Sequence, residues 1–393
     1  MRVTSAKLVE LGIYVLLVLL PLQVRYILVP SSNQFAIVSM YLFDIILVLL
    51  GILWLWYWYT HKTIKPHWHT IWLGLVIAIL AIFSSYFADD QTVALYYWVH
   101  LVLGLWLVAM VSTTPLQQPI VLGIMAVNGL AQASAAMIQF ITQHVASSTW
   151  LGMAAQSPET SGVAVVVTTT GRWLRSYALM PHPNVAAGLM VLGLIALMLL
   201  KKNNWWLPLM SVLTFGLFLT FSRSAVIVWC LMLIVLTIMR KVSLSQVLTT
   251  VATLAVSIAV YWPLVSSRTL NEQYIEQLSI TERQDQLQNF QDLLPRYWPQ
   301  GIGLGQFALD YDQPIHNVPL LIIAELGIFA VIIWYWFIFR SIKFAHPSCY
   351  LLFAIMLLSL LDHYWWTLPS LLLLWMFVVG WGYQGKYHSI NQK

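Results

Sequence analysis

Long apolar runs constrain this chain more than any other feature of its sequence. About a dozen runs of roughly 17–23 residues follow one another, and each is close to the length that an α-helix needs to cross a bilayer. Hydrophobic residues make up 60% of the chain and charged residues only 8%, so a soluble core could not bury this much apolar surface. Lipid offers no hydrogen-bond partner to an exposed backbone. The sequence therefore predicts an all-α polytopic membrane protein.

We expect about twelve transmembrane helices within a single integral membrane domain, residues 1–393. The expected spans lie near residues 8–22, 37–59, 71–87, 93–112, 119–141, 184–200, 205–221, 224–239, 245–264, 317–339, 347–362 and 366–384. No small-residue cleavage site follows the first apolar run, so we interpret it as a retained span and not as a signal peptide. Cys230 and Cys349 lie in or beside expected spans, so we predict no disulfide framework.

The basic residues predict which side of the membrane each loop occupies. In the expected arrangement all nine lysines fall on the side of the two termini, whereas seven of the ten arginines fall on the other side. Because short loops rich in positive charge stay in the cytoplasm, we place both termini inside. The net charge of +5 is then a topology signal, and it does not indicate a nucleic-acid partner.

The use of arginine alone on the outer side favours a phosphate ligand. A guanidinium group is a planar fork that matches phosphate oxygens two at a time, whereas lysine is a hydrated point charge. The alternative is that these arginines pair with the acids of the outer loops. The seven are Arg25, Arg172, Arg175, Arg223, Arg268, Arg283 and Arg296.

Two outer loops, residues 142–183 and 265–316, are long enough to fold. In the first, a valine run flanked by threonines predicts either a short strand or a re-entrant segment. In the second, we expect a helix from Leu270 to Leu294 with a capping box at Ser279 to Glu282, ended by Pro295. Such a helix would lie along the membrane surface or cap the mouth of a candidate active site.

Polar residues gather between this helix and the next apolar run. His316 and Asn317 open that run, and a neutral histidine can accept a proton from a hydroxyl group. Asp312 or Asp310 could orient the histidine ring, and as a pair they also suggest a metal ion. Two acids in a loop are weak evidence, so we predict no metal and no other cofactor. The glycines at 301, 303 and 305 predict tight turning, because no strand precedes them as in a nucleotide-binding loop.

Three further groups contribute candidate site residues. Arg223 lies in the very short loop between two expected spans, and an arginine near the membrane interior usually marks function. Pro183 and Asn184 open a span, with Asn184 expected as the helix cap. Asp362 and His363 precede interfacial aromatic residues and could line the pocket.

These motifs, taken in order, resemble the O-antigen ligase and polymerase superfamily. The resemblance covers roughly residues 170–340. It rests on Arg175 followed by Pro183-Asn184, on Ser222-Arg223, on a polar outer helix with Arg283, on G-x-G-x-G-x-F from Gly301 to Phe307, and on His316-Asn317 entering a span with Glu325-x-Gly327. Ala178 departs from the family, in which glycine is common at that position.

The resemblance implies a metal-independent glycosyltransferase of the bacterial inner membrane. Its donor would be a glycan linked to undecaprenyl diphosphate, and its acceptor a hydroxyl group on a lipid or glycan, such as lipid A-core. Arg223 and Arg283 match the family's diphosphate-binding arginines, with Arg175 as a third candidate, and His316 matches the catalytic histidine. If His316 is not the base, then His182 or the Asp362-His363 pair is the next candidate. A polymerase, a protein O-oligosaccharyltransferase and a twelve-span transporter remain alternatives.

Overall fold

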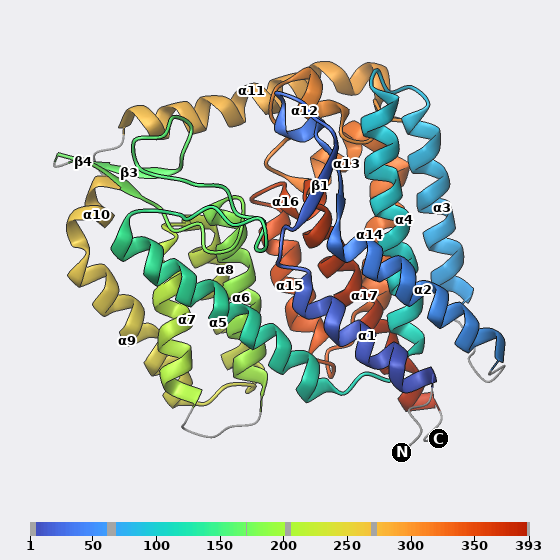
Figure 1. The fold of residues 1–393 in the computed structure, drawn as a ribbon, viewed down its shortest axis with the longest axis horizontal. Coiled ribbons are helices and arrows are strands. Elements are labelled where there is room, and N and C mark those ends of the chain that lie inside the picture. Colours follow the sequence, from blue (N-terminus) through green and yellow to red (C-terminus); the bar gives the residue numbers. More distant parts are fainter. Residues whose placement is uncertain (1–4, 61–67, 170, 201–205, 269–272, 391–393) are drawn as a thin grey trace. The chain divides into compact units, whose positions relative to one another are not determined.

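The computed structural model describes residues 5–60, 68–169, 171–200, 206–268 and 273–390, and it is mostly helical. Figure 1 shows how the helices are arranged, together with the small β-hairpins β1–β2 and β3–β4. The all-α prediction is therefore confirmed for the described residues, apart from the hairpins. Among the described residues, three helices are long and apolar enough to cross a membrane, namely α2, α4 and α5, and shorter apolar helices accompany them. These helices support membrane association.

Each expected span overlaps helix among the described residues, and the number of helices that cross a membrane stays a prediction. The longer helices in these regions are α1 (Ser5–Leu19), α2 (Leu42–Thr60), α3 (Trp68–Ser85), α4 (Gln91–Thr113), α5 (Gln118–Thr142), α6 (Pro183–Leu199), α7 (Leu207–Leu219), α8 (Arg223–Ile238), α9 (Leu244–Val260), α13 (Val318–Leu326), α14 (Ile328–Ser341), α15 (Ser348–Ser359) and α17 (Pro369–Ile390). The remaining helices are α10 (Trp262–Ser266), α11 (Gln273–Tyr297), α12 (Gln306–Asp310) and α16 (Tyr364–Thr367).

The chain divides into two compact units. Unit 1 comprises Met1–Leu20, Arg25–Leu116 and Thr281–Lys393, and unit 2 comprises Pro21–Val24 and Gln117–Ile280. In unit 1, α17 packs along α4, and in unit 2, α5 packs against α6 and α7. The α5–α6 approach depends on two small residues, since a Cβ on Gly129 would lie 2.9 Å from the Cα of Gly193. Small residues at such crossings let helix backbones come close in a membrane.

Two antiparallel β-hairpins interrupt the helical pattern. Strand β1 (Arg25–Val29) pairs with β2 (Val38–Tyr41), a pairing that the sequence did not predict. Because residues 38–41 form β2, helix α2 begins at Leu42, whereas the expected span began at residue 37. Strand β3 (Val165–Thr168) pairs with β4 (Gly171–Leu174). The valine run is thus a strand and not a re-entrant segment.

The expected span 317–339 is broken at Gly327. This residue has φ 85°, which favours glycine, and a Cβ there would lie 2.2 Å from the carbonyl oxygen of Pro299. Helix α13 therefore ends before it and α14 begins after it. The break depends on a contact with a distant loop, which a hydropathy pattern does not contain.

Helix α11 differs from its prediction at its C-terminal end. Its expected start at Leu270 lies outside the described residues, and within them the helix runs from Gln273, so Ser279 and Glu282 lie inside the helix. It continues through Pro295 to Tyr297, and the amide of Trp298 donates to the carbonyl of Leu294 at 2.9 Å. Because a proline removes only its own N–H bond, one placed in the last turn need not end the helix.

Candidate functional site

His316 lies where the loop after α12 enters α13, in unit 1. Its neighbour Asn317 is the N-cap of α13, because its side-chain oxygen accepts from the amide of Leu320 at 3.1 Å. The side-chain amide of Asn317 also donates to the carbonyl of Leu360, at 3.1 Å. The start of α13 is thereby attached to the end of α15. This double attachment holds His316 in a defined position.

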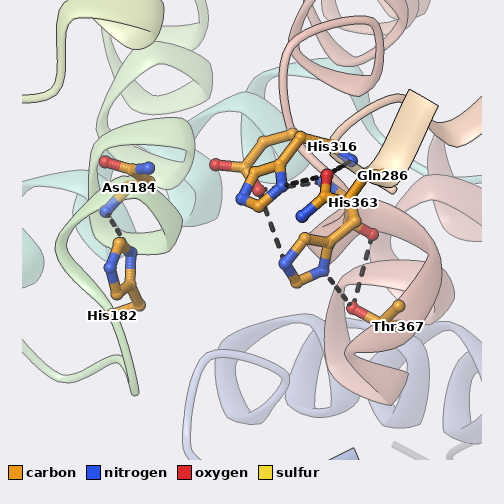
Figure 2. A network of polar contacts seen from close by, with 7 residues as sticks. His182, Asn184, Gln286, His316, His363 and Thr367 are labelled. Carbon is orange, nitrogen blue, oxygen red and sulfur yellow. Dashed lines mark hydrogen bonds and ion pairs between the residues drawn. The ribbon is translucent and has the colours of Figure 1, made fainter. Parts of the chain in front are cut away.

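Gln286 on α11 contacts His316 through two atoms. The backbone N–H of His316 donates to Oε1 of Gln286 at 3.2 Å, and the ring Nδ1 lies 3.0 Å from the same oxygen. Since that amide atom accepts from a backbone N–H, it is the oxygen, and the ring nitrogen facing it must carry the proton. The other ring nitrogen, Nε2, then has a free lone pair. Figure 2 shows this contact.

Asp362 and His363 lie beside His316, as the sequence suggested. The rings of His316 and His363 meet edge to face with centroids 5.0 Å apart. Nε2 of His363 lies 3.8 Å from the buried carboxylate of Asp362, and its Nδ1 lies 2.8 Å from the hydroxyl of Thr367 (Figure 2). Two histidines and one carboxylate, from segments far apart in sequence, thus form one cluster.

Burial controls the protonation of both rings. It lowers the pKa of His316 below its ordinary value, although the negative charges of Asp362 and Glu282 oppose this and the charge of Arg283 adds to it. Burial likewise lowers the pKa of His363, to about 4. Both rings are therefore neutral at pH 7, the state in which an imidazole can accept a proton.

The same cluster offers a possible set of metal ligands. Among the described residues, His316, Asp362 and His363 are the one group whose ligand atoms could hold an ion, and those atoms lie within 4.8 Å of one another. Asp310 and Asp312 form no such group. Asp312 is exposed with φ 64°, and Gln286, in place of either aspartate, makes the contact to the Nδ1 of His316.

Arg175 has a buried position in unit 2. Its Nε donates to the carbonyl of Thr220 at 2.9 Å, and its Nη2 donates to the side-chain oxygen of Asn184 at 2.7 Å. The N-cap of α6 is His182, whose Nδ1 accepts from the amide of Asn184 at 3.2 Å (Figure 2), so the prediction of Asn184 as the cap was wrong. These contacts join the start of α6 to the turn after α7.

The two arginines expected to hold a diphosphate are both exposed, and they belong to different units. Arg223 is the first residue of α8 in unit 2, directly after the short turn that the sequence predicted. Arg283 lies on α11 in unit 1, one helical turn before Gln286, close enough for its charge to act on His316. The match of Arg223 and Arg283 to diphosphate-binding arginines stays a prediction.

Gln286 is the functional candidate that sequence reasoning missed. Its Nε2 is buried without a hydrogen-bond partner among the described residues, so one donor next to the His316 contact is unsatisfied. The spacing Arg283-x-x-Gln286 places both side chains on one face of a helix and was available in the sequence.

Comparison with known proteins finds no family model that matches the chain and no curated protein with a matching sequence.

Proposed function

We propose that the protein is a glycosyltransferase similar to O-antigen ligases. It would transfer a glycan from undecaprenyl diphosphate to an acceptor hydroxyl group, on lipid A-core or a similar molecule. The observation that supports this most is the state of His316. Its Nδ1 donates to Gln286, so its Nε2 is free to accept a proton at neutral pH.

The proposed step is a single displacement at the anomeric carbon. The proton of the acceptor hydroxyl passes to Nε2 of His316 as the oxygen forms a bond to that carbon. The bond from the anomeric carbon to the diphosphate oxygen breaks, and the diphosphate leaves with the electron pair. Arg283 and Arg223 would stabilise the negative charge that develops on the leaving group, because a guanidinium can bind two phosphate oxygens together.

The proposed reaction takes place at the outer face of the cytoplasmic membrane. In the predicted arrangement of about twelve spans, both termini are cytoplasmic and His316, Arg223 and Arg283 lie at the outer side. A donor anchored by its lipid would then present its diphosphate at the membrane rim. The lysine and arginine distribution along the sequence supports this orientation.

The test measures donor binding and transfer separately, with purified protein and a synthetic undecaprenyl-diphosphate glycan. We expect His316→Ala to lose transfer by about 10²–10⁴-fold, the usual contribution of a positioned base, and to keep donor binding. His144→Ala, on a histidine remote in sequence from the site, is the matched control and should retain activity. Near-normal transfer by His316→Ala would show that another group is the base.

The acceptor distinguishes the related activities. A ligase would use lipid A-core, a polymerase would use a second lipid-linked glycan, and a protein O-oligosaccharyltransferase would use a serine or threonine hydroxyl. The same purified enzyme can be offered all three acceptors with one donor. Transfer to one of them assigns the activity.

A transporter is the second candidate. Its supporting observation is a buried pair in unit 1, in which Nε2 of His100 lies 3.2 Å from the carboxylate of Asp44. Ionisable residues inside a membrane protein often mark a transport path. Glycan uptake into proteoliposomes that Asp44→Asn abolishes, without any covalent transfer, would favour this function over the enzyme.

A further inference from the structure

A polar cavity of about 340 Å³ lies in unit 1, apart from the His316 cluster. Its size is at the lower end of the roughly 300–1,000 Å³ typical of small-ligand pockets. The residues around it come from the α3–α4 turn, the second half of α11, the glycine-rich loop and α12. We call it the Asp310 pocket, and the side chains that matter here are Asp89, Asp292, Arg296, Tyr297, Asp310 and Tyr311.

The wall of the Asp310 pocket is held in place before any ligand binds. The side chain of Gln306 accepts from the amide of Asp90 at 2.9 Å and donates to the carbonyl of the same residue at 3.2 Å. This pair of bonds fixes α12 against the α3–α4 turn. The amide of Gly303 also donates to the carbonyl of Glu325 at 3.0 Å. A cavity with fixed walls loses little entropy on binding.

Charge determines which ligands suit the pocket. Three carboxylates and one guanidinium line it, so its formal charge is negative. Burial raises the pKa of Asp310 above its ordinary value, and the charge of Asp89 raises it further, which shows that the two carboxyl groups influence each other. Phosphates and uronic acids would be repelled here. Hydroxyl and amino groups, which donate hydrogen bonds to carboxylates, would be attracted.

Aromatic side chains also line the Asp310 pocket. Tyr297 and Tyr311 line the pocket together with Phe87, and the flat face of such a ring can pack against the C–H face of a sugar ring. The carboxylates do not converge on one point, since Asp89, Asp292 and Asp310 form no metal-ligand group among the described residues. A calcium ion would need six to eight converging oxygen ligands. The lining therefore fits a sugar better than a cation.

We propose that the Asp310 pocket binds one neutral or amino-bearing sugar unit of the glycan substrate, an assignment that rests on the proposed transfer function. The pocket shares helix α11 with the reaction centre. From Gln286, which contacts His316, to Asp292 and Arg296 of the pocket the helix advances about 9 Å and 15 Å, at a rise of about 1.5 Å per residue. A glycan of a few units that reacts at His316 could therefore reach the pocket.

The experiment titrates three monosaccharides against the purified full-length protein, with saturation-transfer NMR as the readout. The probes are glucosamine, N-acetylglucosamine and glucuronate, which carry a positive, a neutral and a negative substituent. We expect glucosamine and N-acetylglucosamine to bind and glucuronate to bind at least tenfold more weakly. In the Asp89→Asn/Asp310→Asn double variant, glucosamine should lose at least tenfold in affinity, about 1.4 kcal/mol.

Two controls keep the result interpretable. Asp285→Asn removes an exposed acid of α11 outside the pocket and should leave all three affinities unchanged. Asp310→Asn alone should give part of the loss if the double variant folds poorly. Equal affinities for glucuronate and glucosamine, or unchanged affinity in the double variant, would overturn the proposal. So would calcium binding that the double variant abolishes and that excludes both sugars.

Further measurements separate the two proposals and identify the source of the sugar. His316→Ala should bind glucosamine as the wild type does. If no transfer activity is found but the sugar affinities follow the expected order, the proposed function fails while the pocket remains a sugar site. If transfer occurs but no probe binds, only the pocket proposal fails. In an active enzyme, a raised KM for the donor or for the acceptor in Asp310→Asn shows which glycan occupies the pocket.

Discussion

At the scale of single residues, the contact between Gln286 and His316 decides what the histidine can do. The amide oxygen fixes the proton on Nδ1, and burial keeps the pKa of the ring below its ordinary value of 6.5. The neutral ring is the reactive form. As the pH falls, activity should therefore stay high past 6.5 and decline only below it.

Substitutions of Gln286 test whether its contact with His316 controls the pH dependence of transfer. In Gln286→Glu a negative charge beside the ring should raise the pKa of His316, so the acid limb of the pH–rate profile should move to higher pH. In Gln286→Ala the ring loses its orienting acceptor, and the rate should fall at every pH. Profiles of transfer rate between pH 4.5 and 8 check both variants. An acid limb that does not move in Gln286→Glu would mean that Gln286 supports the fold only.

The second prediction concerns the two exposed arginines, Arg223 and Arg283. Arg223→Lys and Arg283→Lys keep the positive charge but lose the planar fork, so each should reduce transfer at least tenfold while the protein stays in the membrane. Arg172→Lys, at an exposed residue of strand β4, is the matched control. Transfer assays and immunoblots of membranes measure the two quantities. Full activity in both variants would show that Arg223 and Arg283 do not stabilise the leaving diphosphate.

The third prediction concerns metal ions. We expect transfer by purified protein to survive incubation with EDTA, because the proposed step needs only His316 and the arginines. If transfer needs a metal ion instead, the ligands would be His316, Asp362 and His363, whose ligand atoms lie close together. Loss of activity in EDTA that manganese or zinc restores would replace the base mechanism with a metal-assisted one at this cluster.

At the scale of elements, the glycine-rich loop positions both α12 and α13. Gly303 has φ 105°, and a Cβ there would lie 2.6 Å from the Cβ of Ala88. Gly303→Ala should therefore destabilise the protein by about 1–3 kcal/mol, through backbone strain and overpacking. The tight turning expected from the sequence is confirmed by this conformation.

A matched variant separates this effect from the general effect of adding a methyl group. Gly123 lies within α5, and a Cβ there would meet nothing within 4 Å. Gly123→Ala should therefore stabilise the protein by about 0.5–1 kcal/mol, since glycine is unfavourable inside a helix. Melting temperatures in detergent compare the two variants. Equal melting temperatures would show that the loop adapts to the added methyl group at Gly303.

At the scale of the whole molecule, the predicted topology places lysine-bearing loops inside and arginine-bearing loops outside. Cysteines introduced at Lys241 and Lys343 should resist a membrane-impermeant thiol reagent in intact cells, whereas cysteines at Arg172 and Asp285 should react. The background carries Cys230→Ser and Cys349→Ser, which removes both native thiols. Labelling of Lys343→Cys equal to that of Asp285→Cys would contradict the arrangement.

The sequence alone determined where the helices lie. The apolar runs are long and have few charges, and a backbone in lipid must satisfy its own hydrogen bonds, so helix was the available structure for each run. The sequence also identified His316, Asp362 and His363 as site candidates, because ionisable side chains next to apolar spans are costly without a function.

The tertiary structure decided which of these side chains meet. Gln286 is 30 positions from His316 and belongs to another helix, and the break at Gly327 depends on the carbonyl of Pro299. The hairpin of β1 and β2 depends on pairing across a loop. Such contacts are set by how helices and loops pack, and hydrophobic periodicity within one segment carries no information about the partner that the segment will contact.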